Sequence, residues 1–231
     1  MKSLGVALRI WVIIGLCLLS GGQFSSAFGQ DVEELIRIID EQQRKIETLT
    51  ALFVQTKETS LVKKPLLSSG LVKFKRPDLI HWNYAEPAPM EVAIYGKGIW
   101  IYYPGSLQAE KYYLGRNKRM TQSLGPLLAI FQKTFRQLSD GYAIIYEGLE
   151  TERVHHFRLH PRDEQVQKFL SRVDLWIDKT SGAIIRFKMV EANGDRLSLE
   201  FKNLQINLPL ADDDLKIRIP PSVRVLEQST P

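Results

Sequence analysis

The stretch KFKRPDLIHWNY, residues 73–84, places an arginine and a tryptophan on two adjoining segments that read as strands. At the two-residue period of a strand, Phe74 and Arg76 face the same way, so an apolar strand face ends in a guanidinium group. After a proline-aspartate break, the second segment presents Ile80 and Trp82 on one face. The stretch therefore predicts a sheet with a large apolar face and a charged residue at its edge.

The same two-residue period recurs along most of the chain. Twelve short segments alternate in this way, and Gly, Pro, Asn and Asp turn residues separate them. They are TALFVQTKE, SGLVKFKR, LIHWNY, MEVAIYG, IWIYYPG, EKYYLG, YAIIYEG, RVHHFRLH, FLSRVDLWID, AIIRFKMVEANG, RLSLEFKN and LKIRIPP. A dozen short strands in series predict one antiparallel sheet that curls into a barrel or half barrel.

Two segments have the helical period instead. The first is DVEELIRIIDEQQRKIETL, residues 31–49, with Asp31 as the predicted N-cap and acidic residues in the first turn. Its apolar residues recur at near-helical spacing: Val32, Leu35, Ile36, Ile39, Ile46 and Leu49. This spacing predicts an amphipathic helix ahead of the strands.

The second helical segment, MTQSLGPLLAIFQKTFRQLSDG, interrupts the strands at residues 120–141. Gly125 and Pro126 are expected to interrupt its start. One helical stripe carries Leu124, Leu127, Leu128, Phe131, Phe135 and Leu138. The segment predicts one or two short inserted helices, whose apolar side we expect to cover the concave face of the curled sheet.

The first 29 residues have the pattern of a secretory signal peptide. Lys2 and Arg9 precede an apolar run at residues 10–19, and small and polar residues follow up to Gly29. The run is roughly a dozen residues, whereas a membrane span needs about 20, which disfavours a retained anchor. We expect cleavage near Gly29, which would leave residues 30–231 as one exported domain.

The one cysteine and the charge balance limit the function classes. Cys17 lies in the apolar run behind Leu16, where a lipoprotein signal needs a small residue, so we expect it to be removed with the peptide. The exported chain would then have no disulfide, catalytic thiol or cysteine-ligated metal. Removing Lys2 and Arg9 lowers the net charge from +5 to +3. These scattered charges argue against nucleic acid, but an anionic membrane surface or an acidic partner would suit them.

No local motif indicates catalysis or metal binding. His155 and His156 point to opposite faces of a strand, and His156 and His160 stand about 13 Å apart, so these residues read as solvated. The sequence has no G-x-S-x-G, no H-E-x-x-H and no glycine loop for phosphate. The aspartates at residues 212–214 lack the alternation and glycine of a calcium loop. A fold could still assemble paired carboxylates, but we expect no enzyme, cofactor or metal site.

The aromatic strand faces allow two interpretations. A curled sheet can fill its interior with side chains or keep a cavity for a ligand, and the residues by themselves favour an ordinary core. Arg76 is equally ambiguous, because a strand-end arginine can extend to water.

The run GLVKFKRPDLIHWNYAEPAPMEVAIYGKGIWIYYPGSLQAEKY, residues 70–112, resembles the periplasmic outer-membrane lipoprotein carriers of the LolA family. In that family a strand ending in K-R-P precedes L-aromatic-x-W and then G-K-x-x-W-x-Y-x-P. Other matching features are the F-x-Q at Phe53, the W-I-D-x-x-x-G hairpin at Trp176 and the I-P-P at Ile219. One position departs, because Ile80 stands where the best-known members have an aromatic residue.

The resemblance implies a mainly β fold with α, an unclosed antiparallel half barrel. In it the N-terminal helix and the inserted helices form a lid over an apolar concave face. It also implies a monomeric periplasmic carrier that binds the acyl chains of lipoproteins and transfers them from the inner to the outer membrane. Its partners would be acylated lipoproteins, an inner-membrane ABC transporter that releases them, and an outer-membrane acceptor lipoprotein.

By the same resemblance, Arg76 matches the family's functional arginine, which reaches into the lid and latches the empty carrier closed. Trp82 matches the tryptophan of the concave face. The expected lipid-binding residues are Phe74, Ile80, Trp82, Trp100, Tyr102, Leu127, Leu128 and Phe131. The alternative is a periplasmic carrier or sensor of another lipid or glycolipid, since regulators with an additional domain share the fold.

Overall fold

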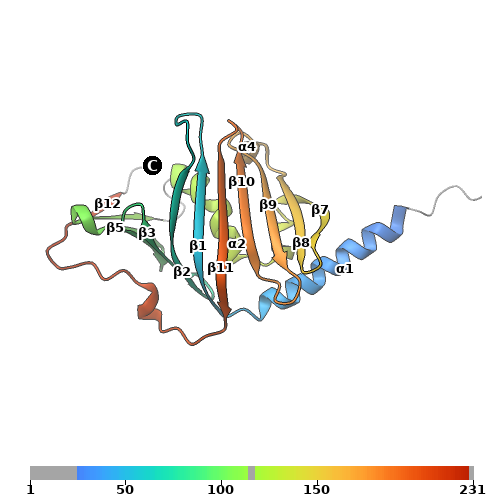
Figure 1. The fold of residues 1–231 in the computed structure, drawn as a ribbon, viewed down its shortest axis with the longest axis horizontal. Helices are drawn as coiled ribbons and strands as arrows, with labels where there is room; N and C mark the ends of the chain where they lie inside the picture. The colour runs from blue at the N-terminus through green and yellow to red at the C-terminus, as the bar shows by residue number, and fades with distance from the viewer. Residues whose placement is uncertain (1–24, 114–117, 229–231) are drawn as a thin grey trace, which may run out of the picture. The chain divides into compact units, whose positions relative to one another are not determined.

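The computed structural model describes residues 25–113 and 118–228 (Figure 1). The chain forms two units, residues 1–36 and residues 37–231. Most of the predicted signal peptide, including Cys17, lies outside the described residues. Helix α1 spans Ser25–Arg44, so the prediction of Asp31 as its N-cap is wrong. The helix also ends earlier than predicted, and Leu49 belongs to the first strand.

Twelve strands of the described residues form one sheet in the order β12-β6-β5-β4-β3-β2-β1-β11-β10-β9-β8-β7. They are β1 (Thr48–Glu58), β2 (Leu66–Lys75), β3 (Leu79–Glu86), β4 (Met90–Tyr95), β5 (Gly98–Tyr103), β6 (Gln108–Tyr113), β7 (Tyr142–Thr151), β8 (Val154–Pro161), β9 (Leu170–Asp178), β10 (Ile184–Glu191), β11 (Arg196–Ile206) and β12 (Val225–Gln228). Every neighbouring pair is antiparallel except β12 with β6. The two strands at the ends of this order, β12 and β7, are not paired with each other, which confirms the predicted unclosed sheet.

The last predicted strand, LKIRIPP at residues 215–221, is wrong. A short 3-10 helix, η2 (Asp212–Leu215), leads into irregular chain, and the twelfth strand comes later, at Val225–Gln228. Pro220 and Pro221 have no N–H to donate to a sheet ladder. Instead, Ile217 and Val223 pack with Tyr102 in a buried cluster.

The inserted segment forms α2 (Lys118–Gln132) and α3 (Phe135–Leu138), which confirms the prediction of one or two helices. α2 continues through Pro126, so the predicted interruption is wrong. A capping box starts α3, in which Gln137 Oε1 accepts from the Thr134 amide at 2.9 Å. The remaining short helices of the described residues are η1 (Pro104–Ser106) and α4 (Glu164–Gln167).

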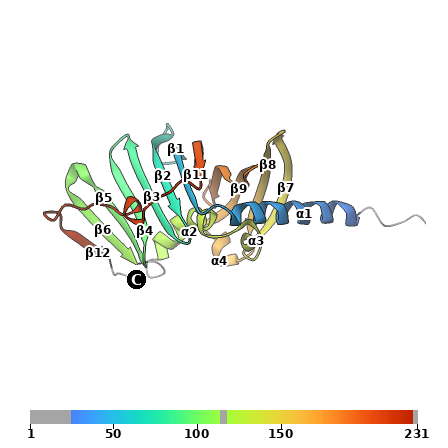
Figure 2. The same ribbon diagram turned by 90° about the horizontal axis from the view of Figure 1, so that it is seen from below.

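α2 and α3 lie against one face of the sheet, here called the inner face (Figure 2). Phe131 of α2 contacts Phe74 on β2, with ring centroids 5.7 Å apart. Phe135 of α3 contacts Phe157 on β8 at 4.6 Å. Because directly paired residues of neighbouring strands point to the same face, the strand register extends this face across the sheet. The opposite side is called the outer face.

The outer face carries a buried carboxylate, Asp174 on β9, which is only 3% exposed. Arg158 and Arg172 each donate a hydrogen bond from Nε to this carboxylate, at 3.1 and 3.0 Å. Burial alone would raise the pKa of Asp174, but the hydrogen bonds and charges of Arg172 and Arg158 outweigh it and lower the pKa below 3.8. Asp174 therefore ties β8 and β9 together in its ionised form.

This carboxylate predicts a specific acid sensitivity. Because the folded-state pKa is the lower one, its stabilisation is complete above the unfolded-state value and is lost as the pH falls through the folded-state value. We expect Asp174→Asn to lower the free energy of unfolding by about 1 to 2 kcal/mol at neutral pH. The difference from wild type should shrink below pH 3.8. Urea unfolding across this range measures it, with the exposed Asp213→Asn as a control that should change little. A difference independent of pH would contradict the assignment.

Candidate functional site

The inner face beneath α2 is a cluster of aromatic rings. Phe131 stands edge-on to Trp82 of β3 and to Phe201 of β11, with centroid distances of 5.2 and 6.0 Å. It also contacts Phe74 at 5.7 Å. The helix therefore covers the centre of the sheet through one side chain that touches three strands.

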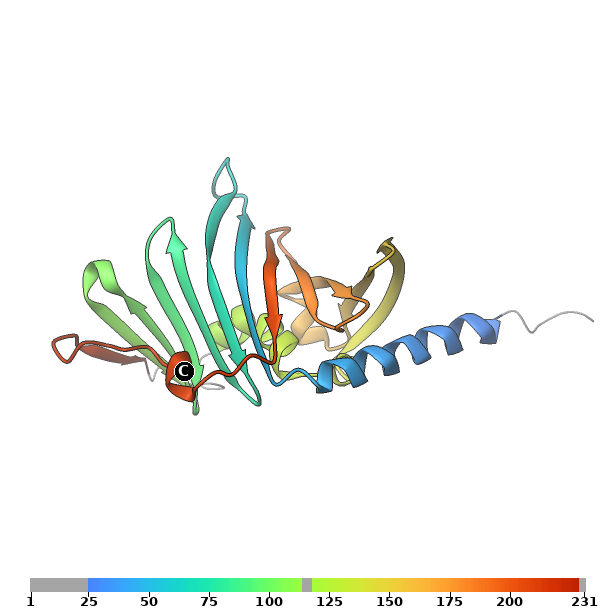
Figure 3. The same ribbon diagram turned by 60° about the horizontal axis from the view of Figure 1, so that its bottom comes forward.

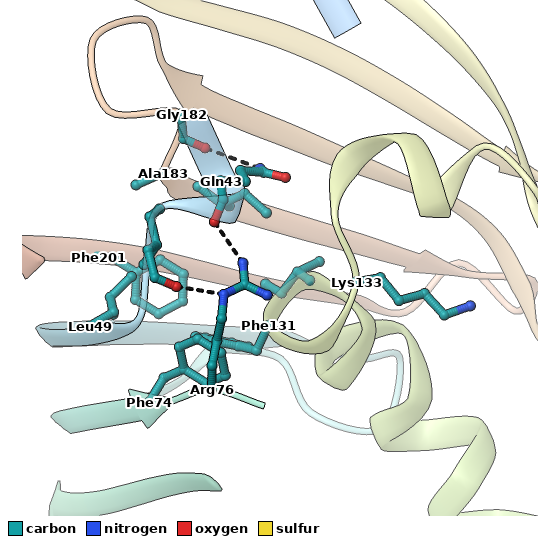
Figure 4. Close-up of a pocket in the computed structure, with 12 residues that line it drawn as sticks. Gln43, Leu49, Phe74, Arg76, Phe131, Lys133, Gly182, Ala183 and Phe201 are labelled. Carbon is teal, nitrogen blue, oxygen red and sulfur yellow. Dashed lines mark hydrogen bonds between the residues drawn. The ribbon is translucent and has the colours of Figure 1, made fainter. Parts of the chain in front are cut away.

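A small cavity lies beside this cluster (Figure 4). Its volume is about 50 Å³, and its wall combines the end of α1, the start of β1, the inner face and the last turn of α2. The lining residues are Gln43, Ile46, Leu49, Phe74, Arg76, Ile130, Phe131, Lys133, Gly182, Ala183, Ile184 and Phe201. On this measure, about 10 to 15 Å³ is enough for one water molecule. The cavity is thus too small for an acyl chain unless α2 moves away from the sheet.

Arg76 lies at the edge of the cavity and is hydrogen-bonded to the end of α1. Its Nε donates to the Ile46 carbonyl and its Nη2 to the Gln43 carbonyl, both at 2.6 Å (Figure 4). Its backbone amide also donates to the Glu47 carbonyl at 2.9 Å. The last carbonyls of a helix lack intrahelical partners and carry partial negative charge, so a guanidinium group is well suited to this position. Of the two side-chain acceptors, Gln43 belongs to α1, and Ile46 lies two residues after its last residue, Arg44.

Gln43 extends this contact to two other elements. Its side-chain Oε1 accepts from the Phe135 amide of α3 at 2.8 Å, and its Nε2 donates to the Gly182 carbonyl at 3.1 Å. Gly182 has a φ of +70°, and a Cβ there would approach Gln42 Cβ to 2.7 Å, so glycine is required. Arg76, the end of α1, α3 and the β9–β10 turn form one connected network, here called the Arg76 network.

Asp40 adds a second connection from α1 to α3. Its Oδ1 accepts from the Arg136 amide at 3.0 Å, and its Oδ2 accepts from Arg44 Nε at 2.8 Å. Burial alone would raise the pKa of Asp40, but hydrogen bonds from Thr134 and the Arg136 amide, with the charge of Arg44, lower it. The carboxylate therefore stays ionised where it holds the start of α3.

Six of the eight predicted lipid-binding residues are buried beneath or on α2. Phe74, Ile80 and Trp82 occupy the inner face, where Ile80 is paired with Phe74 and Ile94. The α2 members are Leu127, Leu128 and Phe131. The Leu124 side chain lies outside the described side chains.

Trp100 and Tyr102 were placed on the wrong face. On β5, Trp100 is paired with Ala93, and Ala93 with His81, which alternates with Trp82 along β3. Both aromatic residues therefore lie on the outer face, where Tyr102 packs with Ile217 and Val223. They do not line the site, and the chain after η2 covers them.

The sequence reasoning missed Phe201 and Gln43. Phe201 is opposite Phe53 in the register of β1 with β11, and the alternation in RLSLEFKN could have identified it. No local signal identifies Gln43, because its partners lie 92 and 139 residues away in the sequence.

Trp82 contributes a polar group to this apolar site. The residue is 3% exposed, and its Nε1–H has no hydrogen-bond acceptor among the residues that the structure describes. A buried donor without an acceptor is unfavourable by about 1 to 3 kcal/mol. A carbonyl that entered the site could accept this hydrogen bond.

One histidine differs from its prediction as a solvated residue, His155, whereas His156 and His160 are partly exposed. His155 is 6% exposed, and its Nδ1 lies 2.9 Å from the Tyr146 hydroxyl. His156 stacks on Trp176 at 4.5 Å on the outer face. Within residues 25–113 and 118–228, no three His, Cys, Asp or Glu side chains gather as metal ligands would. None of the described helices is long and apolar enough to cross a membrane.

The family model and the related sequences carry the same description, an outer-membrane lipoprotein carrier protein. The family model described as outer membrane lipoprotein carrier protein LolA matches residues 44–218. The outer-membrane lipoprotein carrier protein of Pseudomonas paraeruginosa is 26% identical over 184 residues, which cover 80% of this chain and 83% of the relative. That of Pseudomonas putida KT2440 is 23% identical over 222 residues, covering 96% and 99%.

Among solved structures, an uncharacterized conserved protein from Thermus thermophilus shares the fold. Its TM-score is 0.54 at 14% sequence identity, and the match covers 86% of this chain and 100% of that chain.

Proposed function

Because the chain belongs to the LolA family of outer membrane lipoprotein carrier proteins, we propose that it binds the acyl chains of lipoproteins between α2 and the inner face. In this proposal the protein works in the periplasm and carries its cargo from the inner to the outer membrane. The observation that supports it best is the position of Phe131, a helix side chain inserted among rings of three strands. An acyl chain would replace Phe131 and the rest of the apolar side of α2.

The physical need for such a site follows from the cargo. Each methylene group buried from water is worth roughly 0.8 kcal/mol, so a multiply acylated protein leaves a bilayer only if another apolar environment receives it. The inner face offers buried aliphatic and aromatic side chains, including Ile80 and Trp82. The unpaired Nε1–H of Trp82 would meet the ester or amide carbonyl at the head of an acyl chain.

Release requires that the empty site be stable when closed. In the closed arrangement, Arg76 donates to the carbonyls of Gln43 in α1 and of Ile46 just after it, and Phe131 fills the cluster. A ligand that must open this arrangement binds more weakly by the free energy of opening, which favours passing the ligand to the next acceptor. Arg76 acts in this proposal as a latch for the empty state.

The proposal includes binding and transfer but no catalytic step. Loading from an ABC transporter in the inner membrane and unloading to an acceptor lipoprotein in the outer membrane would supply its direction. Both partners are the ones that the resemblance of the sequence to the family implies. Loading and unloading would both use the same movement of α2 away from the inner face.

Tryptophan quenching by labelled acyl chains tests the proposal. Two variants are compared, one keeping Trp82 and one keeping Trp176 on the outer face, with phenylalanine at the other tryptophans. A triacylated lipopeptide with brominated acyl chains should quench the Trp82 emission strongly and leave the Trp176 emission unchanged. Native mass spectrometry of protein purified from envelope extract should then show bound lipoprotein or lipid. Equal quenching of both variants, or none, would rule out binding at the inner face.

A further inference from the structure

The β1–β2 hairpin ends in a loop with exposed aliphatic side chains. Figure 3 shows this hairpin reaching beyond the neighbouring strands. All residues from 61 to 67 are exposed. Leu61, Val62, Leu66 and Leu67 are exposed by 89%, 43%, 51% and 62%. So many large aliphatic groups in one short loop indicate a surface that contacts something other than water.

The same loop is positively charged. Lys63 and Lys64 lie between the two aliphatic pairs, and residues 59–67 contain no acidic residue. Within the described part of the chain, neither lysine forms a salt bridge. Below the loop, by contrast, Arg196 is paired with Glu58 at 3.3 Å. Both ammonium groups are thus available to an anionic surface.

The loop is folded and supported by its own backbone. The Val62 amide donates to the Thr59 carbonyl at 3.3 Å, and the Leu61 amide to Thr59 Oγ1 at 3.4 Å. The Ser60 amide donates to Asp195 Oδ1 in the neighbouring β10–β11 turn at 3.3 Å. The loop therefore presents Leu61 from a formed turn and needs no folding step to do so.

We propose that this hairpin tip, residues 59–67, docks the protein on the surface of an anionic lipid bilayer. The aliphatic side chains enter the boundary between headgroups and acyl chains, and Lys63 and Lys64 contact lipid phosphates. A small apolar tip with adjacent basic residues is the pattern of interfacial membrane binding. A protein interface is the less suitable occupant, because the tip has none of the aromatic or arginine anchors that dominate such interfaces.

The position of the tip suits a carrier. β1 and β2 run from the tip to the Arg76 network, so their length of 11 and 10 residues separates the two by about 30 Å. Docking at the tip therefore leaves the Arg76 network, with the end of α1, away from the bilayer surface. The docking needs no cargo, so the inference goes beyond the proposed acyl-chain site and does not depend on it.

Vesicle co-sedimentation with cargo-free protein tests the docking. Vesicles of phosphatidylcholine with phosphatidylglycerol should bind the protein, and binding should weaken with added salt and on pure phosphatidylcholine. The pair Leu61→Glu and Val62→Glu should weaken binding to the anionic vesicles at least tenfold, because it removes the inserted groups. Lys63→Glu with Lys64→Glu should also weaken it at least tenfold and abolish the salt dependence.

Matched controls come from the opposite end of the strands. Leu149→Glu changes a leucine that is 51% exposed on β7, and Lys97→Glu changes an exposed lysine in the β4–β5 turn. Both should bind vesicles as wild type does, and all variants should keep the wild-type unfolding temperature. Unchanged binding by the tip variants overturns the proposal. It is also overturned if protein-free vesicles bind nothing while envelope vesicles bind through the tip, since the partner would then be a protein.

Discussion

Replacing Arg76 with leucine should give a protein that takes up lipopeptide as well as wild type does but releases it at least tenfold more slowly. The guanidinium group donates two hydrogen bonds, each at 2.6 Å, to the carbonyls of Gln43 in the last turn of α1 and of Ile46 just after it. Hydrogen bonds from a charged donor contribute about 1.5 to 3 kcal/mol, and 1.4 kcal/mol is a factor of ten in an equilibrium. Leucine removes this contribution only from the closed, empty state.

A two-step transfer assay measures the effect. Loading from inner-membrane vesicles and unloading to a purified acceptor are followed separately, at equal concentrations of folded protein. Lys73→Leu is the matched control, since Lys73 lies near the end of β2, which Arg76 directly follows, but faces the outer side, and it should unload normally. The unloading rate of Arg76→Lys should lie between those of wild type and Arg76→Leu. An ammonium group keeps the charge but lacks the planar guanidinium that reaches both carbonyls. If Arg76→Leu unloads as fast as wild type, the latch is disproved.

Replacing Phe131 with alanine should lower the free energy of unfolding by about 3 kcal/mol and yet strengthen the binding of an acyl probe. Phe131 contacts Phe74, Trp82 and Phe201, so its removal takes one ring contact from each of them. The cavity of about 50 Å³ beside it would grow by the volume of the lost ring. An acyl chain would then enter without displacing Phe131, which is why stability and affinity should change in opposite directions.

Urea unfolding and titration with a fluorescent fatty acid measure the two quantities. Tyr102→Ala is the control, because Tyr102 is 6% exposed, similar to the 8% of Phe131, but lies on the outer face. It should also lower stability and leave probe affinity unchanged. A Phe131→Ala protein that is less stable but binds the probe no better would show that Phe131 belongs to an ordinary core.

The strands were predictable because their alternation and turns are local properties of the sequence. The face of Trp100 could also have been derived. A two-residue turn at Gly96 and Lys97 pairs Tyr95 with Gly98, and this register places Trp100 opposite Ala93. A shift of one residue moves a whole strand to the other face, so aromatic content alone could not assign it.

Other parts depended on contacts between distant segments. Residues 215–221 alternate like a strand, but prolines and a buried position for Ile217 decide their structure. Gln43 reads as an ordinary polar residue near a helix end. Its role comes from Phe135 and Gly182, which only the folded chain brings near. Arg76 was identified through its family motif, whereas its acceptors on α1 required the structure.

The unclosed sheet has a consequence for self-association. A sheet that does not close has two edges with unpaired backbone groups, and each could add a strand from a second molecule. At one edge, β12 pairs in parallel with β6, and Glu227 holds it through Lys111 and Tyr113, both at 3.0 Å. The chain's own C-terminal segment thereby covers the antiparallel edge of β6.

The other edge is made unsuitable for pairing. On β7 the register shifts between Tyr146 and Gly148, where Gly148 has a φ of +109°. Glu147 and Glu150 add charge on the same strand, in ion pairs with Arg158 and Arg186. A bulge and charges on an edge strand prevent a flat approach by another strand. Both edges of the unclosed sheet therefore oppose the addition of a strand from a second molecule, although the sheet is not closed into a barrel.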